Sequence, residues 1–271
     1  MDTHLSPAEI ESFYQNGYFA PLRVFSTQET RAYRGCLEEL ERRFADNPFK
    51  MRTDAHLIQR WAWDVVHDPR IVDPVSDVLG PNVLLWSLNW FIKEPRDQKI
   101  VTFHQDATYW GLEPHDVVTA WVALSDASEA TGPMQFVSGS HLEEIRQHTD
   151  TFASNNLLSR GQAIEGDIDE QRVVSAPLQA GEMSLHHVRL IHGSQSNETD
   201  DRRIGMVLRY CATHVRQTKV EDTAVLVKGE DTYQHFELLP EPENEFGEIE
   251  LARHADATRR MSLAIHSKDH Q

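Results

Sequence analysis

The residues best suited to chemistry in this chain are two histidines, an aspartate and an arginine in a defined order. His104-Gln105-Asp106 carries an imidazole and a carboxylate, His192 follows the aspartate by 86 residues, and Arg203 comes 11 residues later. Two imidazoles and one carboxylate can occupy one face of a metal ion and leave the other face open, which suits non-haem Fe(II). The planar guanidinium of Arg203 can pair bidentately with the far carboxylate of a dicarboxylic co-substrate. Together the four residues predict an oxygenase that depends on iron and 2-oxoglutarate.

The elements that hold these residues must bring distant segments together. Residues i and i+2 of a strand point to the same side, so we expect His104 and Asp106 to converge while Gln105 points away. His192 then has to come from a strand that is distant in sequence and close in space, as in a barrel or a sandwich. An H-x-D tripeptide is common by chance, and its meaning depends on the residues that accompany it.

Longer segments around these residues make the pattern specific. They read FHQDATYWG (103–111), VVTAWVALSDASEATGPMQFVSGSH (117–141), AGEMSLHHVRLIHGSQSN (180–197) and DDRRIGMVLRY (200–210). With the opening LSPAEIESFYQNGYFAPLRVFS, they resemble the phytanoyl-CoA dioxygenase family over most of positions 5–210. The resemblance implies a mainly β fold with flanking helices, namely a double-stranded β-helix (a jelly-roll, cupin-like barrel). It also implies Fe(II), 2-oxoglutarate as co-substrate, and O2.

The resemblance implies a role for each site residue. His104, Asp106 and His192 are the expected metal ligands, and Arg203 is expected to hold the 5-carboxylate of 2-oxoglutarate. Polar groups of the preceding strand and an inner tryptophan are expected near the same co-substrate, namely Asn89, Lys93 and Trp121. Edge-strand or core packing explains these last three about as well.

Neighbouring residues compete for two of these assignments. His187 is the alternative third ligand, whereas two nearby histidines fit packing or hydrogen bonding, namely His186 and His141. Arg202 and Arg203 point to opposite sides of one strand, and both sides hold apolar residues. The spacing in the family selects Arg203. An arginine inside a barrel needs an anionic partner, because an unpaired buried charge is costly.

Aromatic and basic residues near the iron motif and on an earlier segment could bind the substrate. Tyr109 and Trp110 directly follow the motif, so we expect them close to the iron. Further candidates for the substrate wall, or for contact with an anionic group of the substrate, are Trp61, Trp63, His115, Arg60 and Arg189. For the tryptophans, ordinary packing in the core is the alternative.

The reaction expected from this pattern is hydroxylation of a C–H bond with release of succinate and CO2. Related halogenating enzymes carry a small residue at the carboxylate position, so Asp106 argues against halogenation. The expected substrate is a small polar metabolite or a secondary-metabolite intermediate, since the sequence shows no Lys/Arg cluster suited to the phosphates of a CoA ester. The alternatives are a cupin-like metal enzyme that is not an oxygenase and a non-catalytic barrel that binds a small molecule. Arg203 argues against the first, and the intact ligand set argues against the second.

Composition limits the domain organisation and the partners. The 271 residues suffice for a single domain with a helical part (about 1–80), a barrel (about 82–215) and a C-terminal extension (about 216–271). The formal charge of −17 repels phosphate backbones and anionic lipid, so neither nucleic acid nor a membrane is an expected partner. Cys36 and Cys211 are too few for a disulfide framework, and no signal segment or bilayer-spanning run is seen. We therefore expect a cytoplasmic protein; its oligomeric state is not indicated.

Turn and capping signals predict helices before about residue 80 and strands after it. Ser6 and Ser26 begin two helices that end near Asn16 and Phe44, and Asp68 begins a third. Short β-branched or aromatic runs predict strands at 82–93, 116–124, 134–137, 172–177, 182–186 and 204–213. The long polar segment 142–170 is expected to form a lid or a binding loop. Residues 251–265 are expected to form a terminal helix.

Overall fold

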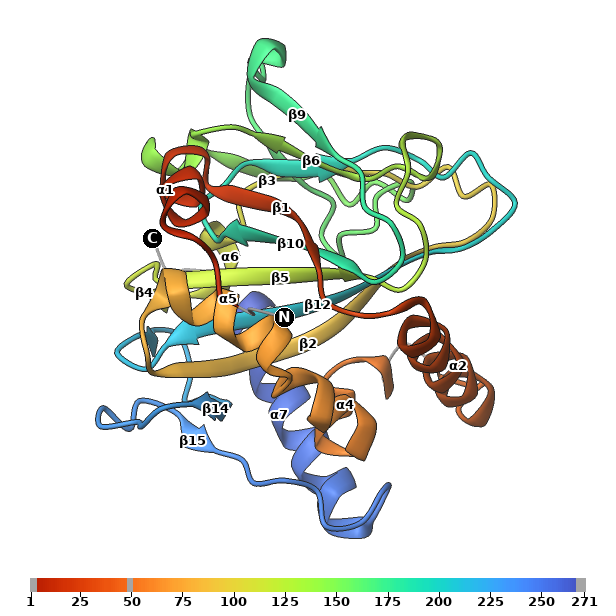
Figure 1. Cartoon of the computed structure of the whole chain (residues 1–271), viewed down its shortest axis with the longest axis vertical. Coiled ribbons are helices and arrows are strands. Elements are labelled where there is room, and N and C mark those ends of the chain that lie inside the picture. The colour runs from red at the N-terminus through yellow and green to blue at the C-terminus, as the bar shows by residue number, and fades with distance from the viewer. Residues whose placement is uncertain (1–3, 48–50, 267–271) are drawn as a thin grey trace.

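Two β-sheets form the centre of the molecule, as Figure 1 shows. The structure, a computed structural model, describes residues 4–47 and 51–266. Within these ranges the major sheet has seven strands in the order β1 (Tyr18–Arg23), β10 (Glu182–His187), β5 (Val117–Ala123), β12 (Arg203–Ala212), β2 (Val83–Lys93), β14 (Thr223–Lys228) and β15 (Glu237–Leu238). The minor sheet has four strands in the order β3 (Val101–His104), β11 (His192–Ser194), β6 (Met134–Val137) and β9 (Val173–Ala176).

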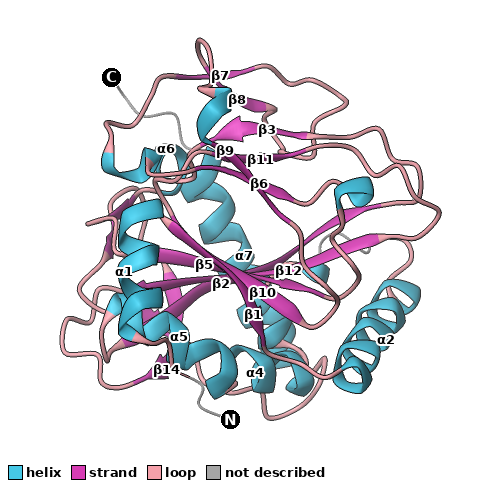
Figure 2. Cartoon of the chain, turned by 45° about the horizontal axis from the view of Figure 1, so that its top comes forward, coloured by secondary structure: helices cyan, strands magenta, loops and turns pink. Residues whose placement is uncertain are grey.

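Helices α4 and α5 lie on the side of the major sheet that faces away from the minor sheet, whereas α6 lies beside β3 of the minor sheet, as Figure 2 shows. The α-helices of the described chain are α1 (Pro7–Asn16), α2 (Thr27–Arg43), α4 (Arg60–Val66), α5 (Pro69–Leu79), α6 (Ala107–Trp110) and α7 (Glu248–His266). The short 3-10 helices are η1 (Ala55–Leu57), η2 (Glu129–Thr131), η3 (Ser140–Leu142) and η4 (Glu170–Arg172). Two small two-stranded sheets complete the described chain, β4 (Leu112–Glu113) with β13 (Arg216–Gln217) and β7 (His148–Asp150) with β8 (Gln162–Ile164).

The first two helices begin at the capping residues that the sequence predicts. The Ser6 backbone N–H donates to Glu9 and the Ser26 backbone N–H donates to Glu29, while each serine hydroxyl accepts from the glutamate backbone N–H. These reciprocal bonds satisfy N–H groups that have no partner inside the helix. Gly17 ends α1 in the left-handed conformation (φ 82°), which glycine adopts without steric cost.

The two faces of β12 pack against different parts of the molecule. Ile204, Met206 and Leu208 belong to the hydrophobic core under the helices. Val207, from the opposite face, packs instead with Trp121 in a cluster between the two sheets. Arg203 shares this inner face because strand side chains alternate, so it is the arginine that enters the interior.

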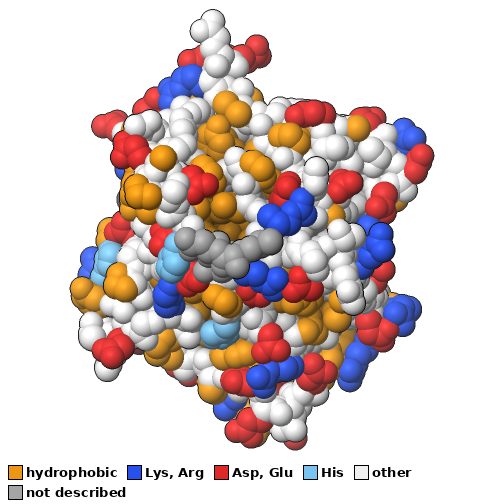
Figure 3. All heavy atoms as spheres, viewed as in Figure 1, with side chains coloured by type: hydrophobic (Ala, Val, Ile, Leu, Met, Phe, Trp, Pro, Cys, Tyr) orange, Lys and Arg blue, Asp and Glu red, His pale blue; other side chains and the backbone are white. Residues whose placement is uncertain are grey.

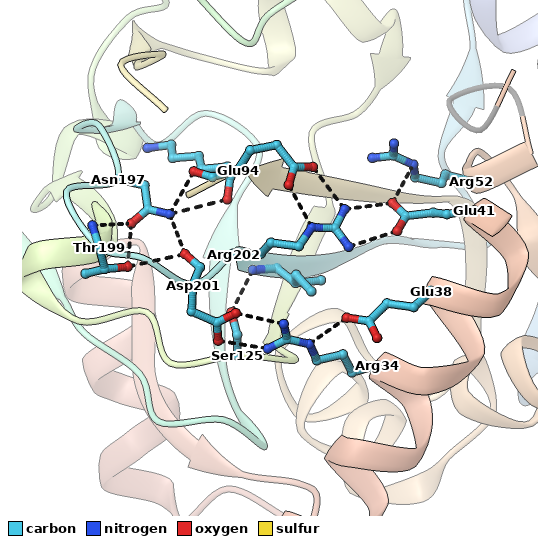
Figure 4. Close-up of polar contacts among 12 residues, drawn as sticks. Arg34, Glu38, Glu41, Arg52, Glu94, Ser125, Asn197, Thr199, Asp201 and Arg202 are labelled. Atoms are coloured by element: carbon cyan, nitrogen blue, oxygen red, sulfur yellow. Dashed lines mark hydrogen bonds and ion pairs between the residues drawn. The ribbon is translucent and has the colours of Figure 1, made fainter. Parts of the chain in front are cut away.

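Arg202, on the outer face, ties α2 to the start of β12, as Figure 4 shows. Its guanidinium nitrogens lie 2.8 Å from both carboxylate oxygens of Glu41 and 2.9 Å from the nearer oxygen of Glu94. Arg34 of α2 makes a second link of this kind: its guanidinium nitrogens lie 2.8 Å and 2.9 Å from the carboxylate oxygens of Asp201. The ion pairs of Arg202 hold it on the outer face, so it does not compete with Arg203 for the interior.

The predicted elements are present, and their grouping needs two corrections. Strand β1 lies within the part predicted to be helical and pairs with β10 at the edge of the major sheet. Strand β14 lies within the predicted extension and pairs with β2. Among the described residues the fold is mainly β with flanking helices, arranged as two sheets without strand pairing between them.

The surface in Figure 3 carries acidic and basic side chains interspersed with small apolar areas. The chain as a whole has a formal charge of −17. No helix in the described ranges combines the length and the apolar character needed to cross a membrane.

Candidate metal centre and co-substrate site

Three metal-ligating side chains meet where β3 pairs with β11. His104 and His192 are partners across this ladder, and their ring centroids are 4.2 Å apart. The carboxylate oxygens of Asp106 lie 3.4 Å from Nε2 of His104 and 3.8 Å from Nε2 of His192. One ligand atom from each residue lies within 4.8 Å of the others, which is compact enough for one ion with bonds of about 2 Å.

Backbone carbonyls fix which nitrogen of each imidazole faces the carboxylate. Nδ1 of His104 lies 2.9 Å from the carbonyl oxygen of Thr102, and Nδ1 of His192 lies 2.9 Å from that of Leu190. A carbonyl oxygen can only accept, so each Nδ1 carries the proton and each Nε2 presents a lone pair. This is the arrangement in which an imidazole binds a divalent metal.

Burial and charge hold these groups in the protonation states that a metal requires. Burial, with the neighbouring His104, lowers the pKa of His192 to about 4. Burial by itself would raise the pKa of Asp106, but the two imidazoles and Arg209 outweigh it and hold that pKa well below its ordinary value. At neutral pH the centre therefore offers a neutral His192 imidazole and a carboxylate.

Asp106 does not share a strand with His104, contrary to the sequence-based expectation. Strand β3 ends at the histidine, and Asp106 has helical backbone angles (φ −59°, ψ −36°) as the residue before α6. The turn into the helix brings its carboxylate back beside the imidazole. Gln105 points away as expected, because its side chain donates to the carbonyl of Arg189 (2.7 Å) and accepts from the backbone N–H of Arg146 (2.9 Å).

Two cavities open onto the ligand atoms. The inner cavity lies between the sheets, and its lining includes His192, Trp121 and Arg203. The outer cavity has a volume of about 410 Å³ and is lined by residues of α6, β2, the 142–170 segment and the end of α7. The side chains that line both cavities are Phe91, His104, Asp106 and Arg209. An ion held by the three ligands would therefore face both cavities.

Arg203 is a buried cation at the inner cavity without a carboxylate partner among the described residues. Its side chain is 1% exposed, and its guanidinium donates to the carbonyls of Gly132 (3.0 Å) and Phe91 (3.5 Å), while Nε has no partner. Burial lowers its pKa to about 10, so it stays charged at neutral pH. A buried charge of this kind is stabilised by an anion, and a carboxylate matches its planar geometry. The donor set therefore fits the far carboxylate of a diacid.

Lys93 is a second buried basic residue, and it pairs with Arg203 across the β2–β12 ladder. Its ammonium donates to the Ser194 hydroxyl (2.7 Å) and to the carbonyl of Gln195. Burial, with the charge of Arg203, lowers the pKa of Lys93 to about 6. Lys93 lines neither cavity directly, and with this pKa its side chain is mostly uncharged at neutral pH.

The other two residues expected near the co-substrate lie in different cavities. Trp121 lines the inner cavity, with the Arg203 guanidinium 5.2 Å from its ring centroid. Asn89 lines the outer cavity, where its side-chain oxygen accepts from the Thr53 hydroxyl (3.1 Å). Trp121 therefore remains grouped with the arginine, whereas Asn89 is placed on the opposite side of the metal ligands.

Of the residues expected at the substrate, the structure brings Tyr109 and Trp110 to the outer cavity. It does not bring the remaining candidates to either cavity, namely Trp61, Trp63, Arg60, His115 and Arg189. Trp61 stacks on Tyr33 in the core under the helices, and Trp63 packs on His67.

The two basic candidates are occupied elsewhere. Arg60 is paired with Asp64 and Glu241 on the surface. Arg189 donates to the carbonyl of Glu143. These contacts account for the two arginines without a substrate.

Two residues at the centre are absent from the predicted site. Arg209 lines both cavities, six positions after Arg203 on the same face of β12, and this shared face is the sequence signal that pointed to it. His186 lines the inner cavity with its ring centroid 4.8 Å from that of His192. His187, the alternative ligand, instead accepts at Nδ1 from the backbone N–H of Arg189 (3.1 Å).

The model of the phytanoyl-CoA dioxygenase family matches residues 13–205, a range that contains the metal ligands and Arg203. The chain belongs to the phytanoyl-CoA dioxygenase family. This confirms the resemblance seen in the sequence. The buried ligand set and the unpaired Arg203 agree with the expected class of enzyme, the non-haem Fe(II)- and 2-oxoglutarate-dependent dioxygenases, and with its cofactors.

Individual relatives of the chain carry the names of different enzymes or domains. The chain is 32% identical over 154 residues to a probable alpha-ketoglutarate-dependent hypophosphite dioxygenase of Stutzerimonas stutzeri, covering 55% of this chain and 52% of the relative. It is 31% identical over 145 residues to phytanoyl-CoA dioxygenase domain-containing protein 1 of Danio rerio, covering 51% and 48%. The chain thus spans about half the length of these curated relatives, so they do not define its reaction.

Among solved structures, the apo form of the non-heme monooxygenase ThoJ is similar over nearly the whole chain. The TM-score is 0.86 at 32% identity, and the match covers 94% of this chain and 96% of that one. A nickel complex of ThoJ matches with a TM-score of 0.81 at 30% identity, covering 94% and 98%. The likeness therefore extends through the helices and the C-terminal segment, beyond the range of the family model.

Proposed function

We propose that this chain is an Fe(II)- and 2-oxoglutarate-dependent dioxygenase that hydroxylates a C–H bond of a small polar or secondary-metabolite substrate. Its two sheets would form the double-stranded β-helix, with residues 1–271 as one domain. The observation that carries the proposal is a metal-ligating triad between two cavities, of which His104 and Asp106 line both, while the inner cavity contains a buried arginine without a carboxylate partner among the described residues. Such a centre has room for a diacid on one side and a substrate on the other.

The chain's own residues would act mainly by binding and orientation. When bound, Fe(II) and 2-oxoglutarate supply the activation of O2 and the oxidation of the substrate, with release of succinate and CO2. His104 and His192 present Nε2 lone pairs because the Thr102 and Leu190 carbonyls hold their Nδ1 protons. Asp106 completes the ligand set and occupies the position that would otherwise be free for a halide, which favours hydroxylation.

Arg203 would hold the 5-carboxylate of 2-oxoglutarate, with Trp121 against it and Lys93 beside it. The support for this assignment is the burial of the Arg203 cation without a carboxylate partner among the described residues. A cupin-like metal enzyme of another class, or a non-catalytic barrel, does not require such an arginine. No contact in the structure favours either alternative.

The outer cavity suits a small molecule rather than a CoA ester. Its volume of about 410 Å³ lies near the lower end of ordinary ligand pockets. Three Arg or Lys side chains line it. Arg52 is paired with Glu41 (3.3 Å), Lys99 shares the lining with Glu94 and Asp97, and Arg209 lies beside the metal ligands. A phosphate-rich ligand would therefore meet a balanced rim instead of a cluster of free cations.

Succinate formation under air tests the proposed reaction. We expect the Fe(II)-loaded enzyme to convert 2-oxoglutarate to succinate, faster in the presence of a substrate, and to put an oxygen atom from O2 into the product. His192→Ala should abolish succinate formation, while His187→Ala, the matched change at the competing histidine, should retain it. Loss with His187→Ala and retention with His192→Ala would overturn the ligand assignment.

A cytoplasmic location and the absence of nucleic-acid or membrane partners remain predictions from the sequence.

A further inference from the structure

Arg209 is a buried cation at the junction of the two cavities. Its side chain is 8% exposed, and its guanidinium donates to the Ser87 hydroxyl (3.1 Å), whereas Nε has no hydrogen-bond partner among the described residues. Asp106 and Asp54 attract it electrostatically, but neither forms an ion pair with it in the described part of the chain. Burying a guanidinium without an ion-pair partner is unfavourable, so a bound anion would stabilise it.

The surroundings of this charge include the outer cavity as well as the inner one. The guanidinium lies 4.8 Å from the ring centroid of Trp110, which lines the outer cavity and not the inner one. The Cα atoms of Arg209 and Arg203 are six residues apart on β12, or about 20 Å at ~3.3 Å per residue. Both arginines line the inner cavity, but of the two only Arg209 also lines the outer cavity and can meet an anion there.

A hydrogen-bond donor accompanies the charge. Tyr109, next to Trp110 on α6, lines the outer cavity, and its buried hydroxyl has no partner among the described residues. Burial raises the pKa of Tyr109 to about 12, so the hydroxyl keeps its proton at neutral pH. Leu157, Leu158 and Ile265 supply apolar lining in the same cavity. The cavity thus combines a cation and a neutral donor with apolar wall.

We propose that Arg209 binds an anionic group of the substrate. The substrate class is then a compact molecule with one oxyanionic group, such as a carboxylate, attached to an apolar body. Pairing at Arg209 would hold the adjacent C–H bonds at the metal-facing end of the cavity, because Arg209 also lines the inner cavity beside His104 and Asp106. The proposal rests on the proposed function, since it assigns the outer cavity to the substrate.

Matched acid and amide probes test the charge requirement. Phenylacetate and phenylacetamide, and hexanoate and hexanamide, differ in the charge of one group and little in shape. Their dissociation constants would be measured by calorimetry with the Fe(II)-loaded protein under argon, with and without 2-oxoglutarate. We expect the dissociation constant of each acid to be at least about tenfold lower than that of its amide, as for a buried charge pair. Equal affinities, or no binding of either acid, would overturn the proposal.

Substitutions then assign the preference to one arginine. Arg209→Gln should remove the preference for the acid, and Arg209→Lys should keep part of it. Arg52→Gln is the matched control, because Arg52 lines the same cavity but already has Glu41 as partner. An acid preference that survives Arg209→Gln would contradict the proposal. If Arg209→Gln does not fold, the probe pairs on the unchanged protein and on Arg209→Lys still decide.

One other source of an anion has to be separated, namely the carboxylate of 2-oxoglutarate nearest the metal. If Arg209 binds that group, Arg209→Gln will lose affinity for 2-oxoglutarate and the probes will show no acid preference, which would overturn the proposal. Failure of the proposed function looks different, because the unchanged protein would then not bind 2-oxoglutarate at all. The comparison of acid with amide in the absence of 2-oxoglutarate is unaffected by that outcome.

Discussion

At the level of single residues, the inner cavity depends on a position that has no side chain. Gly205 lies between Arg203 and Val207 on the inner face of β12, against the side chain of Trp121. A Cβ at Gly205 would lie 2.0 Å from Cζ2 and 2.2 Å from Cε2 of Trp121. The indole occupies the space that a side chain would need, and Arg203 in turn lies over the indole. Glycine at this position is therefore a condition for the arginine's placement.

Gly205→Ala is expected to displace Trp121 and to impair the co-substrate site. Overpacking of this kind costs about 1–3 kcal/mol of unfolding free energy. We also expect weaker binding of 2-oxoglutarate, measured by calorimetry on the Fe(II)-loaded protein. Gly35→Ala is the control, because a Cβ there meets no atom within 4 Å and the residue lies inside α2. That change should stabilise the protein by roughly 0.5–1 kcal/mol. Unchanged stability and affinity in Gly205→Ala would contradict this view of the cavity.

The metal ligands and the co-substrate arginine could be proposed from sequence, whereas the substrate residues could not. His192 and Arg203 stand at the family's spacing; the structure brings His192 together with His104 and Asp106, and Arg203 lines the inner cavity. Arg60 and Arg189 were chosen for their charge, but a charge does not show which partners already occupy it. Arg209 was visible only as a residue on the same strand face as Arg203, and its burial without an ion pair became evident from the fold.

At the level of elements, the 142–170 segment packs over the outer cavity. Within it, β7 and β8 form a hairpin, and Asn156 to Ser159 line the cavity wall. Arg160 joins this segment to the C-terminal helix, because its guanidinium donates to Asp150 (2.8 Å) and to the carbonyl of Ile265 (3.0 Å). It also lies 5.3 Å from the ring centroid of Tyr109. The predicted role of the segment as a lid stays a proposal.

Arg160→Gln is expected to loosen this segment. The variant loses the bonds to Asp150 and α7, so limited proteolysis should cut within 142–170 faster than in the unchanged protein. We expect KM for the substrate to rise several-fold while the affinity for 2-oxoglutarate stays the same. Arg146→Gln is the control, since Arg146 donates to the carbonyls of Glu165 and Asp167 within the same segment. Equal rates of cleavage in Arg160→Gln and the unchanged protein would refute the anchoring role.

Strands with ordinary composition were predictable, and those without it were not. β2, β5 and β12 are long runs of β-branched and aromatic residues, and they lie where the sequence predicts. β1 contains Pro21, which argues against a strand unless it lies at an edge, and β1 does lie at the edge of the major sheet. The turn at Asp106 was not predictable either, because alternation along a strand and a helical turn both return a carboxylate to the same side.

At the level of the whole molecule, buried histidines couple stability to pH. Burial lowers the pKa of His56 to about 3 and that of His187 to about 4, so both stay neutral in the folded chain well below the ordinary value of 6.5. In the unfolded chain they take up protons below about pH 6.5. The folded state therefore becomes less stable as the pH falls from about 6.5 towards 4, and their contribution is constant above that range.

Denaturation in urea at a series of pH values should show this loss. Each fully buried histidine should contribute up to about 1.4 kcal/mol per pH unit to the decline in unfolding free energy. His56→Gln should make the decline shallower, whereas His235→Gln, at an exposed position, should leave it unchanged. A slope that does not respond to His56→Gln would show that other groups control the acid transition.

The most direct test of the central claim is an anaerobic titration of the Fe(II)-loaded protein with 2-oxoglutarate, followed by the weak visible charge-transfer band of the chelate. We expect the band to appear and saturate, and Arg203→Gln to weaken binding by roughly 30-fold or more, as loss of a buried charge pair costs about 2–5 kcal/mol. Arg202→Gln, the adjacent arginine on the outer face, should bind 2-oxoglutarate normally. Bound iron without the band, or an Arg203→Gln variant that binds as tightly as the unchanged protein, would contradict the account.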